Sequence, residues 1–349
     1  MTSIGKKWSL RRVSDQNGLF KLASLDQRPP IEDPIAKVLG TEGLTNNKLL
    51  QREVVNFKRL LIETFQSRSS GLLLDPSFAV PGCLGALDAR KGLMVSLEDP
   101  HSPKSSEGAT RTSPIKNWSV GKIKRLGADA VKLLIWYRPD GPESINQLQR
   151  NLVRAVGEDC VRYDIPFFLE LLSYSPSNAS STKDTSQRLD SKADVVLKSV
   201  EEFAKPEYNV DVFMVESPVD APNVPGVGNG DWNEVQSLFD RLGVLASRPW
   251  VILSMGADMA QFHHIMTHAY KAGSSGYLAG RAYWLDALAC YPDWERMLTE
   301  INGSPLEYLD ALNVLTDEKA LPWHKVKNVE GCQEVTLLLD KEFCLSYDY

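Results

Sequence analysis

The chain has 349 residues, of which 43% are hydrophobic, enough for one large domain or two ordinary ones around a substantial core. The 39 Lys and Arg residues against 45 Asp and Glu residues give a mild formal charge of −6, and no basic block stands out, so we expect no nucleic-acid partner. No apolar run approaches the roughly 18 residues of a membrane span, and the N-terminus lacks the apolar core of a secretory signal. The five cysteines are odd in number and form no CxxC pair, which argues against a disulfide framework and a zinc site. We therefore expect a cytoplasmic protein without a membrane partner, for which a homo-oligomer stays open.

Eight short apolar runs recur along the chain, separated by amphipathic or polar stretches. Near-continuous apolar runs, rather than strict alternation, are typical of parallel strands that are covered on both faces. The predicted strands are Leu19–Leu25, Gly71–Leu74, Leu93–Leu97, Ala130–Tyr137, Ile165–Leu172, Val210–Glu216, Trp250–Ser254 and Gly276–Ala279.

Helical patterns lie between these runs, for example at Asn47–Phe65 and Ala260–Ala272. Eight strands that alternate with helices over about 300 residues predict an α/β fold of the (β/α)8 TIM-barrel type. A doubly wound open sheet is the alternative. That fold usually has a Gly-rich first turn, whereas here the first strand is followed by Asp-Gln-Arg-Pro-Pro.

The chain divides, by this pattern, into an N-terminal arm (residues 1–18), the barrel (19–301) and a C-terminal helical and strand appendage (302–349). The last third is expected to contain helical segments at Asp286–Ile301 and Pro305–Leu315 and an added strand at Glu334–Leu339.

Three polar loops interrupt the alternation of strands and helices. Pro100–Pro114, Ser173–Ser191 and Asp220–Asp231 follow the third, fifth and sixth predicted strands. In a barrel, these loops lie at the C-terminal end of the strands, where substrates bind. Surface insertion without a role is the alternative for each.

Charged residues within or directly after the strands are the candidates for chemistry. Lys132 and Glu170 lie inside apolar strands, where a charge is costly to bury unless it is paired or functional. They form either a structural ion pair or an amine and a carboxylate facing the barrel mouth. Asp26, Asp75 and Glu216 end three other strands.

The turns after the seventh and eighth strands predict an anion site. They carry Ser254, Gly256, Gly280 and Arg281, at the place where barrels bind phosphate with backbone N–H groups and a helix N-terminus. Arg281 would add a bidentate donor. Residue types do not separate phosphate from sulfonate.

Six segments, in order and at matching spacing from about Leu19 to Trp284, resemble the class I tagatose 1,6-bisphosphate aldolase family, including its sulfofructose phosphate aldolase members. They are LASLDQR, GADAVKLL, DIPFFLELL, YNVDVFMVESPV, WVILSMGAD and AGSSGYLAGRAYW. The resemblance implies a (β/α)8 barrel that cleaves a ketose phosphate or bisphosphate through a Schiff base, without a metal or other cofactor. The implied partner is a small-molecule sugar phosphate or sulfosugar.

The same resemblance implies roles for individual residues. Asp26 would position a substrate hydroxyl, Lys132 would be the active-site lysine of the fourth strand, and Glu170 would be the acid–base carboxylate. The residues expected to bind substrate are Gln27, Arg28, Glu216, Ser254, Gly256, Gly280 and Arg281.

One departure from the family concerns the catalytic amine. The family carries its Schiff-base lysine in a Lys-Val-Glu triplet of the sixth strand, whereas this chain has Met214-Val215-Glu216. A thioether cannot form an imine. Natural loss, deliberate substitution and a moved nucleophile are the three explanations. Lys132 is our candidate for a moved nucleophile, although burial and a nearby Glu170 would shift its pKa in opposite directions.

The sequence thus predicts an aldolase-type carbon–carbon lyase, or a transaldolase, for a phosphorylated or sulfonated ketose. A non-catalytic sugar-phosphate-binding barrel is the first alternative. A metal-dependent aldolase-like enzyme with Asp26, Asp75 and Glu170 as ligands is the second.

Overall fold

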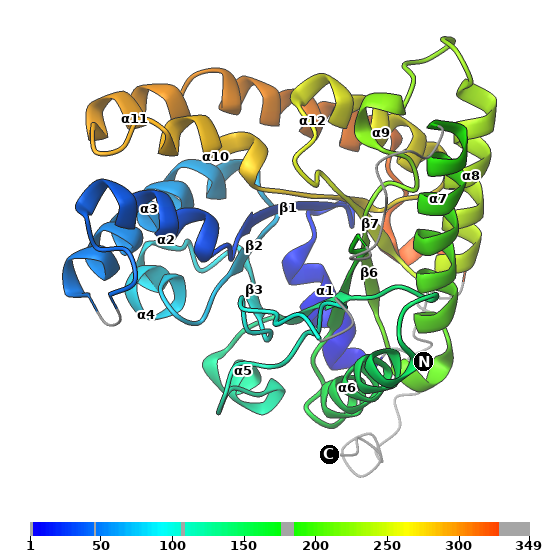
Figure 1. Ribbon diagram of the computed structural model, residues 1–349, viewed down its shortest axis with the longest axis horizontal. Coiled ribbons are helices and arrows are strands. Elements are labelled where there is room, and N and C mark those ends of the chain that lie inside the picture. Colours follow the sequence, from blue (N-terminus) through cyan, green and yellow to red (C-terminus); the bar gives the residue numbers. More distant parts are fainter. Residues whose placement is uncertain (1–2, 45–46, 106–108, 176–184, 328–349) are drawn as a thin grey trace.

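Eight parallel strands close into a barrel in the computed structural model, which describes residues 3–44, 47–105, 109–175 and 185–327 (Figure 1). Each strand pairs with its neighbours in the chain, and β8 pairs with β1. The strands are β1 (Phe20–Leu25), β2 (Gly71–Leu74), β3 (Gly92–Ser96), β4 (Ala130–Trp136), β5 (Phe167–Leu172), β6 (Val212–Val215), β7 (Trp250–Leu253) and β8 (Gly276–Ala279). The predicted TIM barrel is confirmed.

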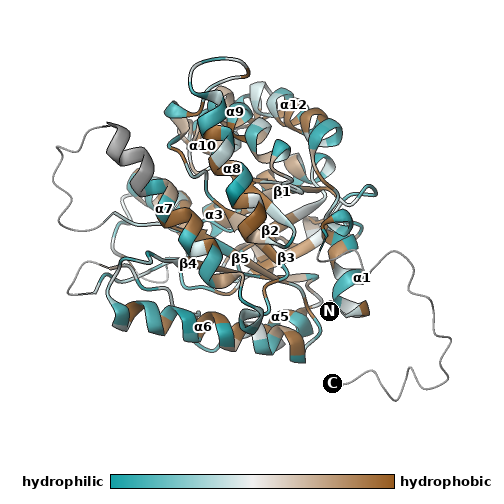
Figure 2. Ribbon diagram, turned by 90° about the vertical axis from the view of Figure 1, so that its right-hand side faces the viewer, coloured by the Kyte–Doolittle hydropathy of each residue, from teal (hydrophilic) through white to brown (hydrophobic). Residues whose placement is uncertain are grey.

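Helices surround the barrel, and several are amphipathic: brown and teal residues alternate along the turns of α6, α7 and α8 in Figure 2. In α3, five apolar residues recur at helical spacing and are buried: Val54, Phe57, Leu61, Ile62 and Phe65. No helix in the described ranges is long and apolar enough to cross a membrane. The helices are α1 (Ile4–Val13), α2 (Pro29–Leu39), α3 (Lys48–Phe65), α4 (Ala79–Cys83), α5 (Val120–Leu126), α6 (Glu143–Arg162), α7 (Thr185–Phe203), α8 (Trp232–Ala246), α9 (Met259–Lys271), α10 (Arg281–Leu288), α11 (Trp294–Ile301) and α12 (Ser304–Lys319).

Two apolar cores result from the alternation of side chains along each strand. The inner core fills the barrel, and the outer core lies between the strands and the helices. In β4, for example, Ala130 belongs to the inner core and Val131 and Leu133 to the outer core. Polar residues at inward positions near the strand ends therefore face the barrel mouth.

The N-terminal end of the barrel is filled. Leu10 and Val13 of α1 join the inner core there, together with Trp323. The Trp323 indole N–H donates to Ser14 Oγ at 3.1 Å, and the buried Lys6 Nζ pairs with Asp211 Oδ2 at 2.7 Å. This end of the barrel is thus closed by both ends of the described chain.

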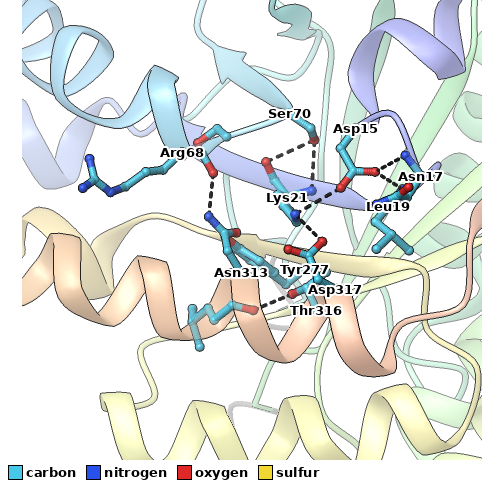
Figure 3. Close-up of polar contacts among 12 residues, drawn as sticks. Asp15, Asn17, Leu19, Lys21, Arg68, Ser70, Tyr277, Asn313, Thr316 and Asp317 are labelled. Carbon is cyan, nitrogen blue, oxygen red and sulfur yellow. Dashed lines mark hydrogen bonds and ion pairs between the residues drawn. The ribbon is translucent and has the colours of Figure 1, made fainter.

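A polar network ties α12 to this end of the barrel (Figure 3). Lys21 Nζ of β1 pairs with Asp317 Oδ1 of α12 at 2.6 Å and with Asp15 Oδ2 at 3.1 Å. The Tyr277 hydroxyl of β8 donates to Asn313 Oδ1 at 2.8 Å. These contacts place the C-terminal half of α12 beside the N-terminal parts of β1 and β8.

Some sequence predictions need correction. The helical stretch Asp286–Ile301 is two helices, α10 and α11, with Pro292 between them, because proline lacks the amide hydrogen that a continuous helix needs. The predicted loop Ser173–Ser191 is shorter, since α7 begins at Thr185. The predicted strand Glu334–Leu339 lies outside the described residues.

Candidate active site

Lys132 lies inside the barrel near its C-terminal face. It follows the inner-core residue Ala130 by two positions in β4, and only 3% of its side chain is exposed. Three carboxylates surround its ammonium group. Asp26 Oδ2 lies 3.0 Å from Nζ, Glu98 Oε1 lies 2.7 Å from it, and Glu170 Oε2 lies 2.7 Å from it. The structure thus brings together Lys132, Glu170 and Asp26 as expected, and adds Glu98.

Opposing effects set the pKa values in this cluster. Burial disfavours the charged form of Lys132, but Asp26, Glu170 and Glu98 outweigh it and raise the pKa of Lys132 well above 10.5. Burial also opposes ionisation of Asp26, yet Lys132 and Arg28 lower the pKa of that carboxyl group. Burial raises the pKa of Glu170, against the attraction of Lys132. In this arrangement Lys132 is an ammonium ion, and Glu170 takes up a proton more readily than Asp26 does.

Met214 of β6 is fully buried in the inner core, and in the parallel register its Cα pairs with that of Glu170. The position is therefore close to the charged cluster, but the side chain carries no group that titrates or attacks a carbonyl carbon.

Asp26, Gln27 and Arg28 follow β1 and face the cluster from the other side of the barrel. Ser24 Oγ donates to Asp26 Oδ1 at 2.9 Å, and Gln27 Nε2 donates to Ser24 Oγ at 2.7 Å. Arg28 is 4% exposed, and its Nη2 donates to the carbonyl oxygen of Glu98 at 2.9 Å. Arg28 Nε and Nη1 and Gln27 Oε1 are buried without a partner. Buried donors without a partner are costly, so these guanidinium N–H groups are suited to an incoming oxyanion.

Asp75 lies outside the cluster. It forms an ion pair with Lys58 Nζ at 2.7 Å, and both side chains are 0% exposed. Lys58 also donates to the carbonyl oxygens of Leu25 and Gln27, so the pair holds the end of β1. In the described part of the chain, no group of three or more His, Cys, Asp and Glu residues is placed to hold a metal ion. The proposed metal set of Asp26, Asp75 and Glu170 is therefore not assembled, and the Lys132 ammonium lies among the site's carboxylates.

A cavity of about 590 Å³ opens beyond the ends of β6 and β7. Glu216, Ser254 and Gly256 line it, as does Lys192 of α7. Glu216 Oε1 accepts the Ser173 N–H at 2.6 Å, and burial raises the pKa of Glu216 against the effects of Ser173 and Lys192. Gly256 has φ +80°, a left-handed conformation that favours glycine.

Gly280 and Arg281 follow β8. A Cβ at Gly280 would lie 2.3 Å from the Ser24 carbonyl oxygen, so only glycine fits between β8 and β1. Arg281 is the first residue of α10, is exposed, and lines a separate cavity of about 230 Å³ with Gly256. Of the four predicted anion-site residues, Ser254 and Gly256 line the larger cavity, Gly256 and Arg281 line the smaller one, and Gly280 lines neither.

Two further residues lie on this face and were not expected from the sequence, Glu98 and Lys192. Glu98 follows the inward residues Met94 and Ser96 by strand alternation, a signal that could have placed it in the mouth. Lys192 lies on α7, one residue beyond the predicted loop Ser173–Ser191, and no local pattern marks it.

Comparison with known proteins shows the family. Residues 41–286 match the model described as DeoC/LacD family aldolase. A protein of Listeria monocytogenes named tagatose 1,6-diphosphate aldolase is 32% identical over 329 residues, covering 91% of this chain and 94% of that protein. A protein of the same name from Lactococcus lactis is 31% identical, covering 91% of this chain and 97% of that protein.

Solved structures agree on the fold. Fructose-bisphosphate aldolase from Plasmodium falciparum superposes with a TM-score of 0.66 at 13% identity, covering 90% of this chain and 95% of that one. An archaeal fructose 1,6-bisphosphate aldolase superposes with a TM-score of 0.57 at 13% identity, covering 89% of this chain and 98% of that one. The match over residues 41–286 and the relatives of 31–32% identity show that the chain belongs to the DeoC/LacD aldolase family.

Proposed function

We propose that the protein is an aldolase-type carbon–carbon lyase, or a transaldolase, that acts on a ketose carrying a phosphate or sulfonate group. Membership of the DeoC/LacD family and the names of the curated relatives support the reaction type. The observation that carries the proposal is the buried cluster of Lys132 with three carboxylates at the barrel mouth. Such a cluster can bind substrate hydroxyls and move protons. A cytoplasmic location stays a prediction.

Glu170 is the proton carrier in this proposal. Its pKa is raised by burial, and its Oε2 lies 2.7 Å from Lys132 Nζ. During cleavage, a carboxylate takes the proton of the hydroxyl group on the carbon that is β to the carbonyl carbon, and the carbon–carbon bond breaks. Asp26, which keeps its charge more readily, would hold a substrate hydroxyl instead.

Imine formation in this chain requires an amine, and Met214 supplies none. Lys132 would first transfer a proton from Nζ to Glu170 Oε2, and the neutral amine would attack the ketose carbonyl carbon. An N–H proton moves to the oxygen to give the carbinolamine. Glu170 then returns its proton to that oxygen, which leaves as water, and the iminium ion remains. Because the pKa of Lys132 is raised well above 10.5, the neutral amine is scarce, and we expect this route to be slow.

A second candidate function is a sugar-phosphate-binding barrel without turnover. Two observations favour it: the thioether at Met214, and the three carboxylates that hold Lys132 as an ammonium ion. In this case Lys132 is a charged ligand for a substrate hydroxyl or anionic group.

Borohydride reduction of the protein mixed with ketose phosphates separates the two functions. The lyase with a moved nucleophile gives a reduced adduct on Lys132, within the peptide Ala128–Tyr137, and Lys132→Ala abolishes it. The binding barrel gives saturable binding, no adduct and no triose product. Triose production without any adduct that stops on chelation would contradict both and favour a metal-dependent reaction.

A further inference from the structure

The cleft beyond β6 and β7 has its own cation, Lys192. Lys192 lines the cavity of about 590 Å³ together with Ser254 and Gly256 of the loop after β7. Arg281, the cation expected for this loop, lines the smaller neighbouring cavity instead. The positive charge that shares a cavity with Ser254 is therefore that of Lys192.

Lys192 is held by a partner that it can exchange. Its Nζ pairs with Asp220 Oδ1 at 2.9 Å, and the Asp220 side chain is 44% exposed. Exposed ion pairs of this kind contribute little to stability because water screens and replaces them. The Lys192 side chain is itself 22% exposed and lines the cavity.

Glu216 is the charged group that an anion would meet on the buried side. Its Oε2 lies 3.9 Å from Lys192 Nζ, and its side chain is 8% exposed. Burial raises the pKa of Glu216 above its ordinary value, which favours the neutral acid. If Glu216 takes up a proton as the anion enters, the repulsion is removed and the acid can donate a hydrogen bond to the oxyanion.

We infer that Lys192 binds the anionic group of the substrate in this cleft, exchanging Asp220 for a tetrahedral oxyanion seated against Ser254 and Gly256. The inference rests on the proposed function only in taking that oxyanion to be the phosphate or sulfonate of a ketose. Lysine is suited to such an exchange because its ammonium group is a point charge on a flexible stem.

The test uses calorimetric titration of the full chain with inorganic phosphate and with methanesulfonate, neither of which can react. Lys192→Gln is expected to weaken binding of the preferred probe roughly tenfold or more, as for loss of a charge-assisted hydrogen bond. Lys192→Arg, which keeps the charge, is the matched control and should retain most of the affinity. Asp220→Asn should tighten binding several-fold, because it removes the carboxylate that competes with the ligand.

A merely structural ion pair would not produce opposite responses of Lys192→Gln and Asp220→Asn. If the pair only held the fold, breaking it from either side would change the anion affinity in the same direction. Unchanged affinity in both variants overturns the inference, as does loss of binding on Arg281→Gln alone. The proposed function is read separately, from triose production and borohydride adducts with ketose phosphates. Phosphate binding that depends on Lys192 without turnover would support this inference and count against the lyase.

Discussion

Glu170 on β5 and Met214 on β6 are partners in the parallel register of the barrel wall, so the carboxylate bound to Lys132 lies beside a thioether. The pairing places position 214 near a charged amine and its acid–base partner. An amine introduced at that position would therefore enter a prepared environment.

Met214→Lys is expected to create Schiff-base chemistry with ketose phosphates. The Lys132 ammonium ion would lower the pKa of the new amine, as like charges do, and Glu170 lies close enough in the wall to move its proton. Mass spectrometry after borohydride reduction should place the adduct at position 214. Met214→Arg adds a cation that cannot form an imine and is the control. A folded Met214→Lys protein without any adduct would contradict the retained aldolase geometry.

Lys132→Met should lower the free energy of unfolding by about 3–5 kcal/mol at pH 8, since it leaves buried carboxylates without their counter-charge. The loss should shrink toward pH 4.5. The buried carboxyl groups of the folded variant have raised pKa values, so as the pH falls they take up protons at a higher pH than the same groups in the unfolded chain. Urea unfolding at both pH values measures it. Lys132→Arg, with the charge kept, should lose much less. An equal loss at both pH values would show that the cluster is not held by charge.

Glu216→Gln is expected to stabilise the fold at neutral pH. The raised pKa of Glu216 means that the folded protein disfavours its charged form. The free energy of unfolding of the wild type therefore falls as the pH rises from the ordinary pKa of 4.5 through the pKa of the folded protein. The variant lacks this fall and keeps an oxygen to accept the Ser173 N–H. The gain is limited to about 1.4 kcal/mol for each unit of pKa shift. Thermal unfolding should show no gain at pH 4 and a gain at pH 7; the reverse order would contradict the pKa direction.

The Lys58–Asp75 pair, with both side chains at 0% exposure, should be strongly coupled. Lys58→Met alone should lower the free energy of unfolding by about 3–5 kcal/mol, because it leaves a buried carboxylate without its counter-charge. Asp75→Asn should lower the free energy of unfolding less in the Lys58→Met variant than in the wild type, since it removes the unpaired buried charge. A double-mutant cycle of unfolding free energies measures this coupling. Strict additivity would show that the ion pair contributes no interaction energy.

Arg28→Lys should weaken the binding of ketose phosphates by about 1.5–3 kcal/mol if the unpartnered Nε and Nη1 hydrogens bind a ligand oxyanion. Lysine keeps the charge but has no planar fork for bidentate contact. Calorimetry with a ketose bisphosphate and with the monophosphate should show the larger loss for the bisphosphate. Equal affinity for wild type and variant would remove Arg28 from the binding site.

Much of the barrel could be predicted from local pattern. The strands Gly71–Leu74 and Gly276–Ala279 match the predictions to the residue, because short apolar runs beside glycine have clear ends. Inward-facing Lys132 and Glu170 could be identified because a charge within an apolar strand is costly unless it has a partner. Lys192 could not, since nothing in its helix indicates that α7 brings it to the end of β6.

The sequence by itself determined the barrel, the family and the thioether at position 214, because strand patterning and residue identity are local properties. Only the tertiary structure decided the state of Lys132. Closing the barrel brings Asp26 of the β1 end, Glu98 of the β3 end and Glu170 of β5 around one ammonium group. Their combined attraction outweighs burial, and the sign of that balance depends on distances of about 3 Å between residues far apart in the chain.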